Sequence, residues 1–259
     1  MMDVYWLEQT EEDVPRENDW LSQTEALQQS GMRFAKRRAD WRLGRWTAKR
    51  AVAACLNLPG HAPALAEIEI RPAPSGAPEV FLANQPAAVT ISLSHRAGAA
   101  ICAVALPGVE LGCDLEMIEP RSDAFVADYF TSEEQALVAQ ASAADRSRLL
   151  ALLWSGKESA LKALRAGLGL DTRCVMVCPE GACQGGDEAG CIEDPTLGVQ
   201  SSHGPGSWRP LQVHYAGSRV FHGWWQCTGN LLRTVVATPP PVPPILLKIP
   251  TGHVAMPLP

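Results

Sequence analysis

Three carboxylates and two lysines occupy two short segments of the chain, and their types and spacing suit metal and phosphate chemistry. Asp114 and Glu116 alternate along a run that we expect to be a strand, so their side chains share a face. Glu158 and Lys162 lie four residues apart in an expected helix, one turn apart on a common face. Carboxylate oxygens suit Mg²⁺, and lysines such as Lys157 suit the phosphates that this metal usually bridges. The pattern therefore predicts a metal site beside a phosphate site.

The same two segments resemble the signature of the 4′-phosphopantetheinyl transferases of the Sfp type, in which a Gly-x-Asp-x-Glu strand precedes a Trp-x-x-Lys-Glu-x-x-x-Lys helix. Here they read Gly112-Cys113-Asp114-Leu115-Glu116 and Trp154-Ser155-Gly156-Lys157-Glu158-Ser159-Ala160-Leu161-Lys162. The resemblance implies Mg²⁺-dependent transfer of 4′-phosphopantetheine from coenzyme A to a serine hydroxyl of an acyl or peptidyl carrier protein, releasing 3′,5′-ADP. The alternative is an acidic strand edge beside a salt-bridged surface helix.

The resemblance also implies a role for each charged residue. The expected ligands of Mg²⁺ are Asp114, Glu116 and Glu158. Lys157 and Lys162 would bind phosphate, and Lys162 would also stabilise the leaving phosphate. Glu158 is the candidate for deprotonating the carrier serine, which makes it both a metal ligand and a catalytic residue.

Glu134 has two competing interpretations. It is the last residue of the run Thr131-Ser132-Glu133-Glu134, which fits a capping box at the start of a helix. The resembling family carries a glutamate here that lies near the metal or the incoming hydroxyl. Glu134 is therefore also a candidate catalytic residue.

Residues 33–56 are expected to form a strongly basic helix. Several of its cations fall on one stripe, namely Arg38, Arg42, Arg45 and Lys49. In an acidic chain such a face suggests an anionic ligand or partner, with a nucleic-acid site or a plain solvated face as the alternatives. The resemblance implies that Arg45, together with Arg37 and Arg38, holds the 3′-phosphate of coenzyme A or faces an acidic carrier protein.

Ser94 and His95 close another expected strand, where a hydroxyl and an imidazole can donate to diphosphate oxygens. A histidine that only packs at a turn is the alternative, and the resemblance favours coenzyme A binding by both residues. The family also has a Gly-Lys-Pro turn whose lysine contacts coenzyme A. The matching turn here is Gly76-Ala77-Pro78, so that lysine is missing.

The composition and net charge limit the classes of protein to which this chain can belong. The 259 residues are 46% hydrophobic and 19% charged, which is ordinary for a soluble globular protein. A net charge of −6 argues against a general nucleic-acid or membrane binder. The first residues have no signal-peptide pattern, and the longest apolar stretch, 97–106, is too short to span a bilayer. We expect a cytoplasmic protein, and a monomer because the site can form within one chain.

Periodicity and turn residues predict two comparable halves. The predicted strands are 4–7, 67–71, 79–82, 88–94, 99–106, 109–117, 212–215, 220–226 and 233–237, and the predicted helices lie within 33–56 and 124–164. This order favours an α+β fold of two pseudo-two-fold-related subdomains with the site between them, as the resemblance also implies. We expect subdomains at 1–107 and 108–238, a loop at 179–208, and a proline-rich extended tail at 239–259.

Four clustered cysteines do not have the paired spacing of a zinc knuckle: Cys174, Cys178, Cys183 and Cys191. Reduced thiols in a loop are favoured there over a metal site. Two other function classes stay open for the whole chain. One is a catalytically impaired module that binds coenzyme A or a carrier protein, motivated by Ala77. The other is a nucleic-acid-binding regulator that uses the basic helix.

Overall fold

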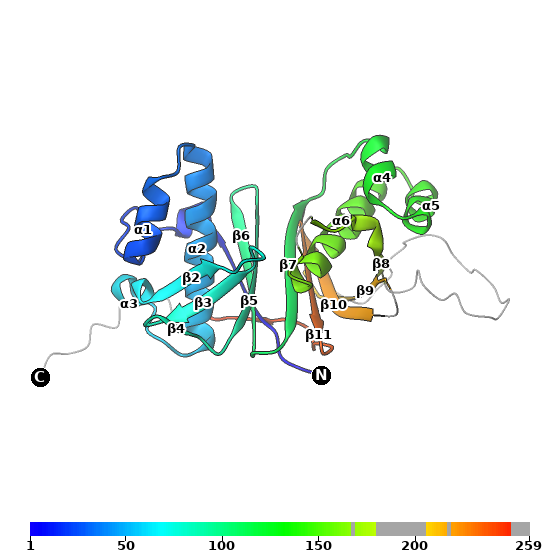
Figure 1. Ribbon diagram of the computed structural model, residues 1–259. Helices are drawn as coiled ribbons and strands as arrows, with labels where there is room; N and C mark the ends of the chain where they lie inside the picture. Colours follow the sequence, from blue (N-terminus) through cyan, green and yellow to red (C-terminus); the bar gives the residue numbers. More distant parts are fainter. Residues whose placement is uncertain (167–168, 180–205, 217–218, 250–259) are drawn as a thin grey trace, which may run out of the picture.

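The computed structural model describes residues 1–166, 169–179, 206–216 and 219–249. Figure 1 shows two lobes side by side, each with a sheet and a long helix, so the prediction of a mixed α+β fold is confirmed. We name them the N-terminal lobe, residues 1–105, and the C-terminal lobe, residues 110–238. Within the described ranges, no helix combines the length and the apolar character needed to cross a membrane.

The N-terminal lobe places its sheets against one long helix. Its elements are β1 (Tyr5–Thr10), α1 (Gln23–Ser30), α2 (Ala35–Cys55), α3 (Ala62–Ala66), β2 (Ile68–Pro72), β3 (Pro78–Leu82), β4 (Gln85–Pro86), β5 (Thr90–Arg96) and β6 (Ala99–Ala105). Strands β1, β6 and β5 form one sheet and β2, β3 and β4 another. Alanine and valine side chains of α2 enter the core between them.

The C-terminal lobe repeats this plan. Its elements are β7 (Glu110–Met117), α4 (Asp123–Tyr129), α5 (Ser132–Gln140), α6 (Arg146–Ala163), β8 (Val175–Pro179), β9 (Arg209–Tyr215), β10 (Arg219–Thr228) and β11 (Leu231–Thr238). The sheet order is β7-β11-β10-β9-β8. In each lobe the first strand pairs antiparallel with the last one, and a long helix packs on that pair.

A buried ion pair occurs at corresponding places in the two lobes. Lys49 Nζ on α2 lies 2.5 Å from Glu25 Oε2, and Lys157 Nζ on α6 lies 2.7 Å from Glu134 Oε2. All four side chains are almost completely buried. Because a buried charge is costly without a partner, each pair must form for its helix to pack.

The surroundings of the two glutamates also correspond. Each belongs to a capping box, opened by Ser22 in α1 and by Thr131 in α5. The second carboxylate oxygen accepts a main-chain hydrogen bond from Ile70 of β2 in one lobe and from Val177 of β8 in the other, at 3.1 Å and 2.8 Å. The repeated plan therefore extends to individual polar contacts.

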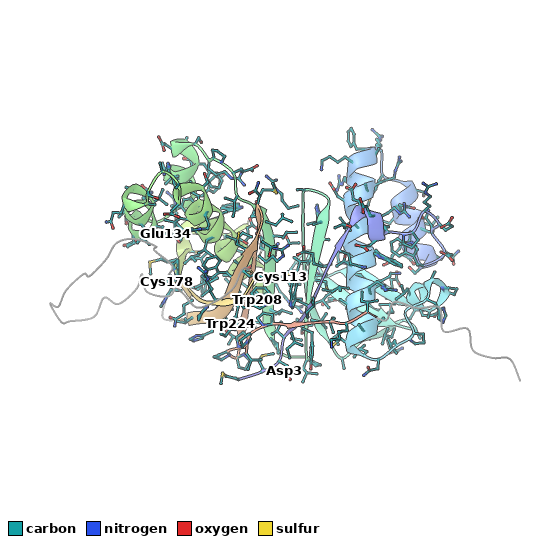
Figure 2. The ribbon with its side chains drawn as sticks, turned by 180° about the vertical axis from the view of Figure 1, so that it is seen from behind. Asp3, Cys113, Glu134, Cys178, Trp208 and Trp224 are labelled. Carbon is teal, nitrogen blue, oxygen red and sulfur yellow. The ribbon has the colours of Figure 1, made fainter. Side chains whose placement is uncertain are left out.

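The lobes meet through buried apolar side chains. Ala99, Ile101 and Ala103 of β6 share a buried cluster with Cys113 and Leu115 of β7. Figure 2 shows Cys113 at this junction. The close approach of β5 and β7 brings the end of one strand of the N-terminal lobe beside the acidic strand of the C-terminal lobe.

The proline-rich segment after β11 was predicted as an extended tail outside the core, and this prediction is wrong for residues 239–249. The segment returns to the N-terminal lobe, where β12 (Ile245–Leu246) pairs with β1 in parallel. Trp224 Nε1 donates to the carbonyl of Pro241 at 3.1 Å, and Leu247 and Ile249 pack on the core of the N-terminal lobe. We call residues 239–249 the strap.

The remaining predictions concern the helices and the cysteines, and their outcomes differ. The helix expected at 33–56 is confirmed as α2. The helices expected within 124–164 are confirmed as α4, α5 and α6, and Thr131 is the N-cap of α5 as predicted. Residues 180–205 of the expected loop, with Cys183 and Cys191, lie outside the described residues. Cys178 was expected as a free thiol but is disulfide-bonded, whereas Cys174 is free.

Candidate active site

Residues from both lobes converge on Asp114. Ser94 of β5 donates its hydroxyl hydrogen bond to Asp114 Oδ1 at 2.8 Å. Lys162 of α6 lies 2.7 Å from the same oxygen and also donates to the carbonyl of Cys113 at 3.0 Å. The strand, the helix and the second lobe are therefore joined at one carboxylate.

Local structure explains how Asp114 is held. The main-chain N–H of Cys113 donates to the hydroxyl of Ser92, a 2.9 Å bond that fixes β7 beside β5. Gly112 lets the main chain of α6 lie against β7, because a Cβ atom at this position would be 1.7 Å from the carbonyl oxygen of Ser159. The glycine of the Gly-x-Asp-x-Glu motif thus serves close packing of the helix.

Glu116 lies on the same strand face and is surrounded by donors. Trp154 Nε1 donates to Glu116 Oε1 at 3.1 Å, and Arg121 Nη2 lies 3.3 Å from Glu116 Oε2. Arg96 Nε is 3.7 Å from that second oxygen. The sequence carried no signal of this Trp154 contact, because the two residues lie 38 positions apart in the chain.

Glu158 is the least restrained of the carboxylates. It makes no hydrogen bond or ion pair with any residue in the described part of the chain. Burial raises the pKa of Glu158, and the charges of Asp114 and Glu116 raise it further against the opposing effect of Lys162. Burial and Asp114 likewise raise the pKa of Glu116. The three carboxylates therefore lie within one another's electrostatic field.

The carboxylate set fits a divalent cation in its chemistry. In the described ranges no group of three or more His, Cys, Asp or Glu side chains is already arranged around a metal position. However, Asp114 Oδ2 is buried without a hydrogen-bond partner, and a cation would satisfy it. Carboxylate oxygens are the ligands that Mg²⁺ prefers. Asp114, Glu116 and Glu158 could therefore bind this cation if their carboxylates turned toward one another.

His95 borders a hollow beside this cluster. The hollow has a volume of about 540 Å³ and is lined by Phe34, Lys36, Arg37, Asp40, Trp41 and His95. Desolvation lowers the pKa of His95, and the positive charges of Lys162 and Lys36 lower it further, against Asp40 and Asp114. His95 therefore lies between the basic start of α2 and the acidic strand.

The predicted roles of Arg38 and Arg45 are not supported. Arg45 lies over the ring of Trp41, 5.0 Å from its centroid, and 3.7 Å from Glu25. Arg38 donates to the carbonyl of Met32 at 3.0 Å. The stripe on which they lie faces the interior of the N-terminal lobe, where Arg42 donates to carbonyls of residues 15–17. Lys36 and Arg37 line the hollow instead.

The predicted ligand and catalytic roles of Lys157 and Glu134 are corrected as well. Lys157 is fully buried and donates to the carbonyl of Thr172 at 2.9 Å, so it cannot reach a bound phosphate. Figure 2 shows Glu134 among the helices of the C-terminal lobe, away from the junction of the lobes. A sequence signal existed, because Trp46-x-x-Lys49 and Trp154-x-x-Lys157 repeat one pattern.

Residues 110–186 match the family model of the 4′-phosphopantetheinyl transferase superfamily. The match to the superfamily covers well under half of the chain and includes the acidic strand and α6. It does not distinguish the Sfp type from others.

Comparisons with curated proteins and with solved structures do not define the family further. No curated protein matches this chain significantly. Among solved structures, the crystal structure of Helicobacter pylori holo-[acyl-carrier-protein] synthase in complex with coenzyme A is 18% identical, covering 40% of this chain and 98% of that chain. Its TM-score is 0.32.

Proposed function

We propose that this protein transfers the 4′-phosphopantetheine group from coenzyme A to a serine hydroxyl of an apo acyl or peptidyl carrier protein, releasing 3′,5′-ADP. The observation that carries the proposal is the meeting of Ser94, Asp114 and Lys162 at one oxygen, at 2.7–2.8 Å, beside Glu116 and Glu158. The superfamily match over residues 110–186 supports it.

Coenzyme A would lie along the junction of the lobes. Lys36, Arg37 and His95 line the hollow and offer positive or neutral donors to its phosphates. Ser94 would donate to a diphosphate oxygen after leaving Asp114. Asp114, Glu116 and Glu158 would hold Mg²⁺, which when bound neutralises charge on the diphosphate.

The chain's own residues then supply proton transfer and charge stabilisation. Glu158 accepts the proton of the carrier serine, because no hydrogen bond or ion pair with the described residues restrains its carboxylate. The serine oxygen bonds to the phosphorus that bears pantetheine, and the bond from this phosphorus to the bridging oxygen breaks. The electron pair goes to the 5′-phosphate of the leaving 3′,5′-ADP. The Lys162 ammonium stabilises this charge, since Asp114 keeps the pKa of Lys162 raised in spite of burial.

We further propose an Sfp-type enzyme that acts as a cytoplasmic monomer without nucleic-acid or membrane partners. One chain contributes both sides of the candidate site, which supports the monomer. The hypothesis of a nucleic-acid-binding regulator is weakened because Lys49 and Arg42, on the basic stripe of α2, are already bound within the lobe. The basic rim of the hollow would also suit an acidic carrier protein.

The test is the intact mass of apo carrier proteins after incubation with this protein, coenzyme A and Mg²⁺. A gain of one phosphopantetheine that is lost with chelator or with Asp114→Ala supports the function. The control Asp123→Ala removes a carboxylate that is almost fully exposed and paired with Arg146. Coenzyme A binding without modification of any carrier would favour the impaired binding module suggested by Ala77. No binding of coenzyme A would reject the transferase and the coenzyme A-binding form of that module.

A further inference from the structure

Two arginines hold the outward side of Glu116. Arg96 ends β5 in the N-terminal lobe, and Arg121 lies between β7 and α4. Both guanidinium groups approach Glu116 Oε2, at 3.7 Å and 3.3 Å, while Trp154 donates to the other oxygen. Glu116 is therefore held by protein donors at both oxygens, and it must give up at least one contact before it can bind a cation.

Glu119 is the second partner of both arginines. Arg96 Nη2 lies 2.6 Å and Arg121 Nη2 lies 3.2 Å from Glu119 Oε1. The Arg96 and Glu119 side chains are 40% and 39% exposed, and an exposed ion pair contributes only about 0–1 kcal/mol. An anionic ligand with more charge than a carboxylate can therefore displace these contacts at little cost.

Resting on the proposed function, we propose that Arg96 and Arg121 are exchangeable positioning residues that hold Glu116 in the free protein and move to the diphosphate of coenzyme A when Glu116 turns to Mg²⁺. Two guanidinium groups match phosphate oxygens in bidentate geometry. They would supply the cationic contact that Ala77 cannot make. Arg71 is a poorer substitute because its partners, Glu69 and Asn84, lie on or beside β2 and β3 and do not belong to the candidate site.

The exchange makes binding of the two ligands cooperative. Without the diphosphate, Mg²⁺ must draw Glu116 away from both arginines. With the diphosphate present, the arginines have another partner and Glu116 is released. Mg²⁺ and coenzyme A should therefore strengthen each other's binding by more than their direct attraction accounts for.

The experiment measures the dissociation constants of Mg²⁺ and coenzyme A by titration calorimetry, each with and without the other ligand. The variants are Arg96→Gln, Arg121→Gln and the double variant, with Arg96→Lys as the charge-conserving form. Arg148→Gln, which removes a surface pair with Asp145 on α6, is the matched control. Thermal unfolding of each variant checks that it is folded. If the double variant does not fold, the single variants at these half-buried positions still test the exchange.

In the double variant, Mg²⁺ alone should bind more tightly and coenzyme A with Mg²⁺ about tenfold more weakly, which is a loss of about 1.4 kcal/mol. The factor by which each ligand lowers the dissociation constant of the other should fall by about tenfold in the double variant. Arg96→Lys should retain part of this factor. Unchanged coupling in the double variant overturns the exchange, even if coenzyme A affinity drops. Absence of coenzyme A binding by the unmodified protein instead rejects the proposed function, and the exchange with it.

Discussion

Gly112 of β7 lies directly against the main chain of Ser159 in α6, so close that no side chain fits between them. This contact sets the spacing between the strand that carries Asp114 and the helix that carries Glu158. The glycine at this place therefore acts on the candidate site through packing, with no contact to a ligand.

Gly112→Ala should destabilise the protein by about 3 kcal/mol or more, because the strand and the helix must separate to admit the methyl group. Urea unfolding measures the change. Gly44→Ala is the control, since a Cβ atom there meets nothing within 4 Å and helix propensity predicts a gain of about 0.5–1 kcal/mol. Equal effects of the two substitutions would contradict the packing role.

Glu158→Gln should stabilise the metal-free protein while abolishing transfer, because burial and the charges of Asp114 and Glu116 disfavour the glutamate anion. The folded-state pKa of Glu158 is raised, so the native protein loses stability as the pH rises from the unfolded pKa through the folded one. Above that window the glutamine variant should therefore be the more stable protein. Thermal unfolding against pH checks this, with the exposed Glu67→Gln as control.

Lys157→Met should cost about 3–5 kcal/mol of stability, because it leaves the Glu134 carboxylate buried without its partner. Lys49→Met should have a similar cost through Glu25, since the pairs correspond. Denaturant titration gives both values. If Lys157→Met kept the stability of the unmodified protein but lost affinity for coenzyme A, Lys157 would have to bind phosphate directly.

Lys36→Gln with Arg37→Gln should weaken coenzyme A binding by about tenfold with little change in stability, because both side chains are exposed at the hollow. Arg42→Gln should do the reverse, since its guanidinium binds carbonyls inside the lobe. Calorimetry and thermal unfolding separate the two effects. Arg33→Gln, at an exposed position just before α2, is the matched control.

Leu247→Ser should lower stability by about 1–2 kcal/mol, because this strap residue packs on the core of the N-terminal lobe. The neighbouring Lys248→Ser should have almost no effect, since Lys248 is exposed. Urea unfolding compares them. A neutral Leu247→Ser would mean that the strap adds nothing to the fold.

Much of the site follows from local sequence. Period-two alternation is a property of any strand, and it places Asp114 and Glu116 together without knowledge of the fold. A four-residue step does the same for Glu158 and Lys162 in a helix. The bounds of α2 and of most strands could be predicted for the same reason, because these patterns act over short distances.

Tertiary structure decided which charges are exposed. A stripe such as Arg42, Arg45 and Lys49 is compatible with solvent, with a ligand or with a buried partner, and only the segment packed against it selects among them. Lys157 is buried because Glu134 and the carbonyls of the following segment surround it. The strap returns to β1 through main-chain hydrogen bonds, which any residue except proline can donate. Contacts of this kind join residues far apart in the chain, so local sequence patterns cannot predict them.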